Sequence, residues 1–94
     1  MLSKIPINLD GIDKKILDIE ILRVGIIAEL DAINLYEQMA VMAQDKNIKI
    51  MLLNIAKEEK THVGEFQTLL LNRDKEQTIE METGKEEVKK EVGE

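Results

Sequence analysis

The sequence contains no cysteine, a single proline and only two aromatic residues, Tyr36 and Phe66. The absence of cysteine excludes disulfides, iron–sulfur clusters and cysteine-ligated zinc sites. Because aromatic residues are scarce, isoleucine, leucine and methionine must fill the interior, which suits helices packed side by side. No apolar run approaches the roughly 20 residues that a membrane-spanning helix needs, and no signal peptide is visible. We therefore expect a soluble cytoplasmic protein with no membrane partner.

Basic residues are scarce relative to acidic ones. The 94 residues include 13 basic and 19 acidic residues, which gives a net charge of −6. A surface that binds nucleic acid would be basic, so we expect no nucleic-acid partner. The length leaves room for one small domain, residues 1–94. A chain this short builds a thin core, which a bound metal or oligomerisation would strengthen.

Helical periodicity predicts two long helices, over about residues 12–44 and 48–71, joined by a turn that begins at Asp45. Residues 1–11, which contain the only proline, are interpreted as an extended lead-in. Gly25 is the only poor helix former inside the first helix, and it would allow the close approach of another backbone. The two helices are expected to fold into an antiparallel hairpin.

Residues 73–94 differ from the two helices because they are mostly charged and contain few apolar side chains. Thr83-Gly84 is expected to separate a short third helix, over about residues 85–92, from the rest of this tail. A helix of that length is marginal on its own. It therefore needs a surface on which to dock.

Both long helices carry an apolar stripe at the three-and-four spacing that is typical of a bundle-facing surface. On the first helix the stripe comprises Leu22, Ile26, Glu29, Ile33, Tyr36 and Ala40. On the second helix it comprises Ile48, Leu52, Ile55, Glu59, His62, Phe66 and Leu69. In each stripe polar residues take central positions where leucine or isoleucine is expected. Buried carboxylates of this kind need a compensating partner.

Glu59 and His62 form an E-x-x-H step, which puts a carboxylate and an imidazole on one face of the second helix. A lone E-x-x-H is common by chance, so its place in the stripe carries the argument. Glu29 lies 16 positions before Asp45, and His62 lies 16 positions after Lys46. In an antiparallel hairpin these residues come level, and Glu59 is one turn away. The sequence therefore predicts that three potential metal ligands converge inside the apolar seam.

These three side chains would make half of a two-metal site. Two helices cannot enclose a core, whereas two hairpins make a four-helix bundle. A two-fold dimer would combine two copies of Glu29, Glu59 and His62, which gives two imidazoles and four carboxylates with a charge of about −4. Two divalent cations balance that charge. Oxygen-rich ligation with one histidine per metal favours iron or manganese over a structural zinc site.

The same residues also allow an interpretation without metal. Glu29 would then set the register of a helical dimerisation module, and His62 would hydrogen-bond to a neighbouring helix. Tyr36 is most simply a core aromatic whose hydroxyl needs a partner. It also lies two turns from Glu29, close enough to donate to a metal ligand. Glu58, which precedes Glu59, is expected on the solvated surface.

Residues 27–38 and 58–62, followed by residues 66–71, resemble the encapsulated ferritins, which are ferritin-like proteins housed inside encapsulin nanocompartments. The resemblance spans about residues 21–71. It implies an all-α fold with an antiparallel two-helix hairpin and a short C-terminal helix. It further implies that this protomer dimerises into a ferritin-like four-helix bundle, and that five dimers form a ring-shaped decamer. A ferroxidase centre would be shared by two protomers.

Carried over residue by residue, the resemblance implies that Glu29, Glu59 and His62 hold iron, with Tyr36 beside the centre. It also implies that Asp31 belongs to a secondary metal site that leads iron toward the centre.

Two departures from the family pattern concern this secondary site. Some relatives carry a second acid just before the ligand glutamate, where this chain has Ala28, and some carry a tryptophan just before the tyrosine, where it has Leu35. We therefore expect a weaker secondary site. Family members reach their shell through a C-terminal targeting peptide or by fusion to the shell protein. Residues 91–94 show no apolar targeting peptide, which suggests the N-terminal piece of such a fusion.

The leading functional prediction is a ferroxidase that uses oxygen to convert Fe(II) to Fe(III), with two irons per dimer and thus about one per chain. A solid four-helix bundle has no cavity for mineral, so storage would take place in the surrounding encapsulin compartment, where the protein is expected to reside. A rubrerythrin-like di-metal peroxide scavenger is one alternative, because it would use similar ligands. The non-enzymatic dimerisation module is the other, and it would bind no metal.

Overall fold

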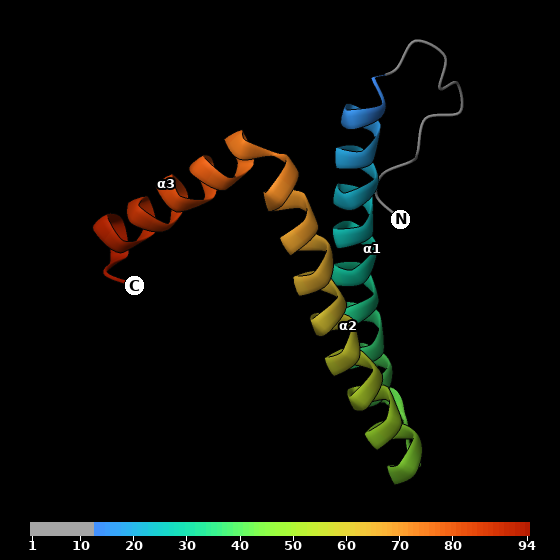
Figure 1. The fold of residues 1–94 in the computed structure, drawn as a ribbon. Coiled ribbons are helices and arrows are strands. Elements are labelled where there is room, and N and C mark those ends of the chain that lie inside the picture. Colours follow the sequence, from blue (N-terminus) through green and yellow to red (C-terminus); the bar gives the residue numbers. More distant parts are fainter. Residues whose placement is uncertain (1–12) are drawn as a thin grey trace.

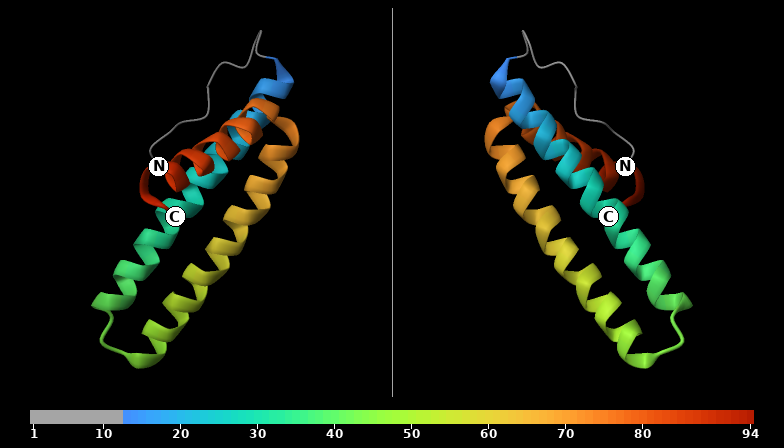
Figure 2. Two further views of the ribbon diagram at one scale, coloured as in Figure 1. Left: turned by 90° about the vertical axis from the view of Figure 1, so that its left-hand side faces the viewer. Right: turned by 90° about the vertical axis from the view of Figure 1, so that its right-hand side faces the viewer.

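The computed structural model describes residues 13–94, which form three helices (Figure 1). Helix α1 spans Lys14–Met42, α2 spans Lys46–Arg73 and α3 spans Lys75–Val92. Helices α1 and α2 run antiparallel and pack along each other (Figure 2), whereas α3 slants away from the end of α2 (Figure 1). The predicted all-α class and helical hairpin are confirmed. The lead-in predicted for residues 1–11 lies outside the described residues.

The hairpin turn is fixed by an aspartate at the start of α2. The Asp45 carboxylate accepts hydrogen bonds from the amides of Asn47 and Ile48, at 2.8 and 3.0 Å. An aspartate at this position satisfies amides that lack a partner within the helix. The helices predicted over residues 12–44 and 48–71 are both present, and each observed end lies two residues from the predicted one.

The predicted C-terminal helix is present and ends at Val92 as expected, but its predicted start at residue 85 is wrong, because α3 begins ten residues earlier, at Lys75. The amide of Gln77 donates to the Asp74 carboxylate at 3.0 Å, and this cap starts the helix. Thr83-Gly84 does not interrupt α3, since a glycine inside a helix costs only about 1 kcal/mol relative to alanine. The helix ends at Gly93, whose φ of 79° is a left-handed conformation that glycine adopts without strain.

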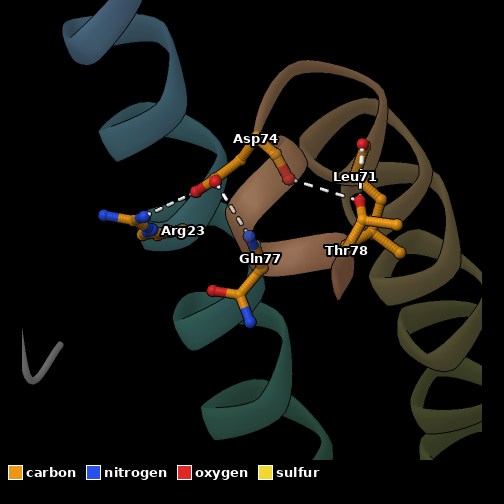
Figure 3. A network of polar contacts seen from close by, with 5 residues as sticks. All are labelled: Arg23, Leu71, Asp74, Gln77 and Thr78. Carbon is orange, nitrogen blue, oxygen red and sulfur yellow. Dashed lines mark hydrogen bonds and ion pairs between the residues drawn. The ribbon is translucent and has the colours of Figure 1, made fainter. Parts of the chain in front are cut away.

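Asp74 is the only non-helical residue between α2 and α3, and side chains around it fix the direction that α3 takes (Figure 3). Its carboxylate accepts from the Arg23 guanidinium on α1 at 2.8 Å. The Thr78 hydroxyl donates to the Leu71 carbonyl at 2.8 Å, across the break between the helices. These contacts tie the start of α3 to both helices of the hairpin.

The core of the hairpin is small. Its buried apolar residues are Ile33 and Ala40 on α1 and Ala56 and Leu70 on α2. Because so few residues are buried, the packing of a single copy leaves most of its large apolar side chains at the surface. None of the three described helices has an apolar stretch that could span a membrane.

The exposed apolar residues of α1 and α2 lie mainly on two opposite sides of the hairpin. The first side, here called the site face, carries Ile21, Leu35 and Met39 on α1 and Ile48, Met51 and Leu69 on α2, all exposed. By helical period these residues share the side on which Phe66 touches Gly25. The opposite side, here called the arm face because α3 starts there, carries exposed Leu30 and Val41 on α1 and Ile50 and Leu53 on α2. Each face is an unfilled packing surface.

Candidate metal centre

Glu29, Glu59 and His62 meet where the two helices of the hairpin lie level. Each offers a ligand atom, and these atoms all lie within 4.8 Å of one another. The His62 Nδ1 atom is 3.3 Å from Glu59 Oε2 and 3.5 Å from Glu29 Oε2. The convergence that the sequence predicts for these three residues is therefore present in the structure.

Two local features bring these side chains together. Glu59 and His62 are three residues apart on α2, so the helical turn places them on one face. Glu29 reaches them from α1 because the turn capped by Asp45 sets the register of the antiparallel pair. Apolar residues precede and follow these polar positions in each stripe.

The electrostatics of the cluster are unbalanced. The Glu29 and Glu59 side chains are only 18% and 19% exposed, and Glu29 Oε2 is fully shielded from solvent with no hydrogen-bond partner. The 3.5 Å separation from His62 Nδ1 is an ion-pair distance but is too long for a good hydrogen bond. Two largely buried carboxylates close together repel each other unless a cation or proton lies between them. The orphaned oxygen thus fits a site built to receive a cation.

The cluster opens toward the site face. The His62 side chain is 44% exposed, more than twice as exposed as either carboxylate. One copy of the chain therefore presents two carboxylates and one imidazole at a surface that is otherwise apolar. Oxygen-rich donors with one imidazole suit iron or manganese, and three donors leave any metal ion open to further ligands.

The other residues singled out from the sequence do not join this cluster. Tyr36 is half-buried on α1, and its hydroxyl makes no hydrogen bond to another described residue. Asp31 is exposed and does not belong to the group of three ligand candidates. Glu58 is exposed as expected.

Sequence reasoning missed one contact at the joint between α2 and α3 and misinterpreted the role of another residue. Arg23 holds Asp74 across 51 positions, and nothing in the local pattern indicated this pair. Gly25 was expected to let another backbone approach, but it is the ring of Phe66 that lies against it. The signal was present, because Gly25, next to the first stripe, and Phe66, on the second stripe, are each four residues from a ligand candidate.

Comparison with known proteins agrees with this architecture. Residues 20–93 match the family model for rubrerythrin. A ferritin-like–encapsulin shell fusion protein of Pyrococcus furiosus is 62% identical over 74 residues, which are 79% of this chain and 21% of that relative. The chain thus spans about a fifth of the length of the curated relative that it matches.

A solved structure matches the whole chain. The crystal structure of the encapsulated ferritin domain from Pyrococcus furiosus has a TM-score of 0.87 and 55% sequence identity, over 100% of this chain and 98% of that one. The fold, the family model and this near-complete match agree. The chain belongs to the rubrerythrin family and, within it, to the encapsulated ferritin domains.

Proposed function

We propose that this domain is a ferroxidase that converts Fe(II) to Fe(III) at a di-iron site shared between two copies of the chain. The observation that carries the proposal is the cluster of Glu29, Glu59 and His62, in which a buried Glu29 oxygen has no partner. Iron is the substrate, and each Fe(II) gives up one electron to the oxidant, which we take to be oxygen.

A second copy is needed to complete the site. Two copies of the cluster supply four carboxylates and two imidazoles, and the charge of about −4 is balanced by two Fe(II) ions. His62 is half-exposed within the apolar site face, so docking two site faces buries apolar area and joins the two clusters. The expected content is thus two irons per dimer, about one per chain.

The residues take different roles in this proposal. Glu29 and Glu59 hold and charge-balance the two irons, and each His62 completes the ligand set of one iron. The resemblance to encapsulated ferritins implies that Tyr36, two turns from Glu29 on α1, would donate its hydroxyl to a ligand of the centre. Asp31 is exposed, as a residue that captures Fe(II) from solvent must be, although a single carboxylate makes only a weak secondary site.

The two apolar faces support an assembly larger than a dimer. Docking through the site face leaves Leu30, Val41, Ile50 and Leu53 exposed on the arm face. A second contact through the arm face would link dimer to dimer, and such alternation closes into a ring when the rotation permits. We propose a ring of five dimers, as the resemblance to encapsulated ferritins implies.

The relative and the solid packing of the helices support an encapsulin compartment as the place of work. The relative from Pyrococcus furiosus is fused to an encapsulin shell, so we propose that this domain works inside an encapsulin compartment in the cytoplasm, as part of a similar fusion. Packed helices leave no room for mineral, and the compartment would supply that space.

The direct test compares aerobic Fe(II) oxidation by the wild type, Glu29→Ala and Glu58→Ala. Glu58 is exposed beside Glu59 and serves as the matched control. The proposal expects the rate with Glu29→Ala to fall to that of free Fe(II), while Glu58→Ala oxidises iron as the wild type does. Equal rates for wild type and Glu29→Ala would defeat the assignment.

The match to the rubrerythrin family favours a second candidate, a di-metal peroxide scavenger with the same ligands. Parallel assays with oxygen and with hydrogen peroxide as oxidant separate the two functions. The non-enzymatic dimerisation module has less support, because a residue that only sets register has no need of an unpartnered buried oxygen. That module predicts no bound metal and tolerance of Glu29→Leu.

A further inference from the structure

The only phenylalanine of the chain lies over a glycine of the facing helix. A Cβ atom placed on Gly25 would lie 3.1 Å from Phe66 Cε1 and 3.2 Å from its Cδ1 and Cε2 atoms. Carbon atoms in comfortable contact are about 3.5–4.0 Å apart. Gly64 and Gly84 have nothing within 4 Å of the same position. Among the described helical glycines, Gly25 is therefore the one whose missing side chain makes room for a neighbour.

This contact lies directly beside the ligand cluster on both helices. Gly25 precedes Glu29 by four residues, and Phe66 follows His62 by four residues. Residues four apart lie one above the other on a helix face. Since Glu29 comes from α1 and His62 from α2, the distance between their ligand atoms depends on how closely the two helices approach at this level.

We propose that Phe66, seated on Gly25, is a positioning pair that sets the separation of α1 and α2 beside the cluster and thereby its affinity for a divalent cation. The inference rests on the proposed function, because it takes Glu29, Glu59 and His62 to be metal ligands. Neither residue of the pair touches the metal. They act through the turns of helix that carry the ligands.

An alanine methyl at position 25 requires the ring, or the helix that carries it, to move by a few tenths of an ångström. Metal–ligand distances hold within about 0.2 Å in a well-formed site. A displacement of this size one helical turn away therefore changes the distance between the Glu29 carboxylate and the two ligand side chains on α2 by more than a well-formed site tolerates. Smaller aliphatic side chains at position 66 would leave the helices without their spacer.

The test titrates metal-free protein with Co(II), whose d–d absorption reports binding without any turnover. The variants are Gly25→Ala, Phe66→Leu and the double variant, with Gly64→Ala as the matched control in open space on α2. Near-ultraviolet circular dichroism of the single phenylalanine reports ring packing directly, and thermal unfolding of each metal-free variant reports stability.

The proposal expects Gly25→Ala to bind Co(II) about tenfold more weakly or worse, as is typical when residues that orient ligands are lost. Gly64→Ala should bind as the wild type does. The double variant should regain affinity relative to each single variant, because leucine leaves room for the methyl group and the methyl group fills the space left by the ring. Unchanged binding by Gly25→Ala, or a double variant no better than its singles, would overturn the positioning role.

Two further outcomes remain distinct. If Gly25→Ala fails to fold, the Co(II) affinities of Phe66→Leu and of the double variant are compared instead. Tighter Co(II) binding by the double variant supports the positioning pair, whereas equal binding overturns it. Wild-type protein that binds no Co(II) would overturn the proposed function itself, and the positioning role with it.

Discussion

At the scale of single residues, the feature that distinguishes this cluster from an ordinary polar cluster is one carboxylate oxygen of Glu29. Glu29 Oε2 is buried without a hydrogen bond, although an imidazole lies 3.5 Å away. Proteins rarely leave a buried carboxylate oxygen unpaired, because the free energy of desolvation is not recovered. Removing charge from the cluster should therefore change the stability of the protein.

Glu29→Gln should stabilise the metal-free protein by about 1 kcal/mol, since it removes the repulsion between two largely buried carboxylates. The same change should abolish the rise in Tm that Fe(II) or Co(II) gives the wild type, because the amide is a poor metal ligand. Thermal unfolding with and without metal measures both effects. Glu58→Gln, on the exposed side, should change neither, and a metal-free Glu29→Gln less stable than wild type would contradict the argument.

At the scale of helices, most of the arrangement is encoded locally and the rest depends on a single long-range pair. The stripes predict α1 and α2, and the turn at Asp45 predicts the level at which Glu29 meets His62, because period and register suffice for both. The length of α3 was underestimated because charged residues and Gly84 gave no apolar pattern to follow. Its direction depends on the Arg23–Asp74 pair, which no local spacing reveals.

Asp74→Ala should loosen the first turn of α3, because it removes both the cap on Gln77 and the partner of Arg23. Loss of a cap costs about 1 kcal/mol, so exchange of the Gln77 amide with solvent should accelerate about fivefold. Arg23→Gln removes only an ion pair whose guanidinium is half-exposed and leaves the cap on Gln77 in place, so its effect should be smaller.

Hydrogen exchange read residue by residue is the measurement for this pair of variants. Glu80→Ala, at an exposed position of α3, is the control and should leave exchange in the first turn unchanged. Equal protection of Gln77 in Asp74→Ala and wild type would show that α3 does not depend on this cap.

At the scale of the whole molecule, the two apolar faces predict two different interfaces. The site face was partly foreseeable, because His62 and Glu59 interrupt a stripe that needs a partner. The arm face was not, since exposure of Leu30, Ile50 and Leu53 follows from the tertiary packing of the hairpin and not from any one helix. The ring itself depends on a second copy and stays a prediction.

Met51→Glu and Leu53→Glu should therefore have different effects. Both residues are about half-exposed and two positions apart on α2, at 56% and 48%. A charge at Met51 on the site face should prevent pairing of the clusters and remove bound metal. A charge at Leu53 on the arm face should stop the assembly at metal-loaded dimers. Sedimentation with elemental analysis distinguishes these products, and the same product from both variants would refute the two-interface scheme.

Chelation should shift the wild-type protein to smaller species in size-exclusion chromatography. A metal that binds the dimer and not the monomer stabilises assembly by mass action, and at a hundred times its Kd it contributes about 2.7 kcal/mol. Re-addition of Fe(II) without oxygen should restore the larger species. An elution profile indifferent to chelator would place the metal within one subunit.

Because a single residue, Asp74, joins α2 to α3, a small tilt of α2 would displace the far end of α3 by a larger distance. With 18 residues and a rise of about 1.5 Å per residue, the arm extends roughly 27 Å from its pivot. A tilt of α2 by about 5° would sweep its tip through about 2 Å on that geometry. Because the chain has no cysteine, one engineered thiol near Val92 can carry a probe of that motion, and a tip that stays still on metal loading would mean that metal binding does not tilt α2.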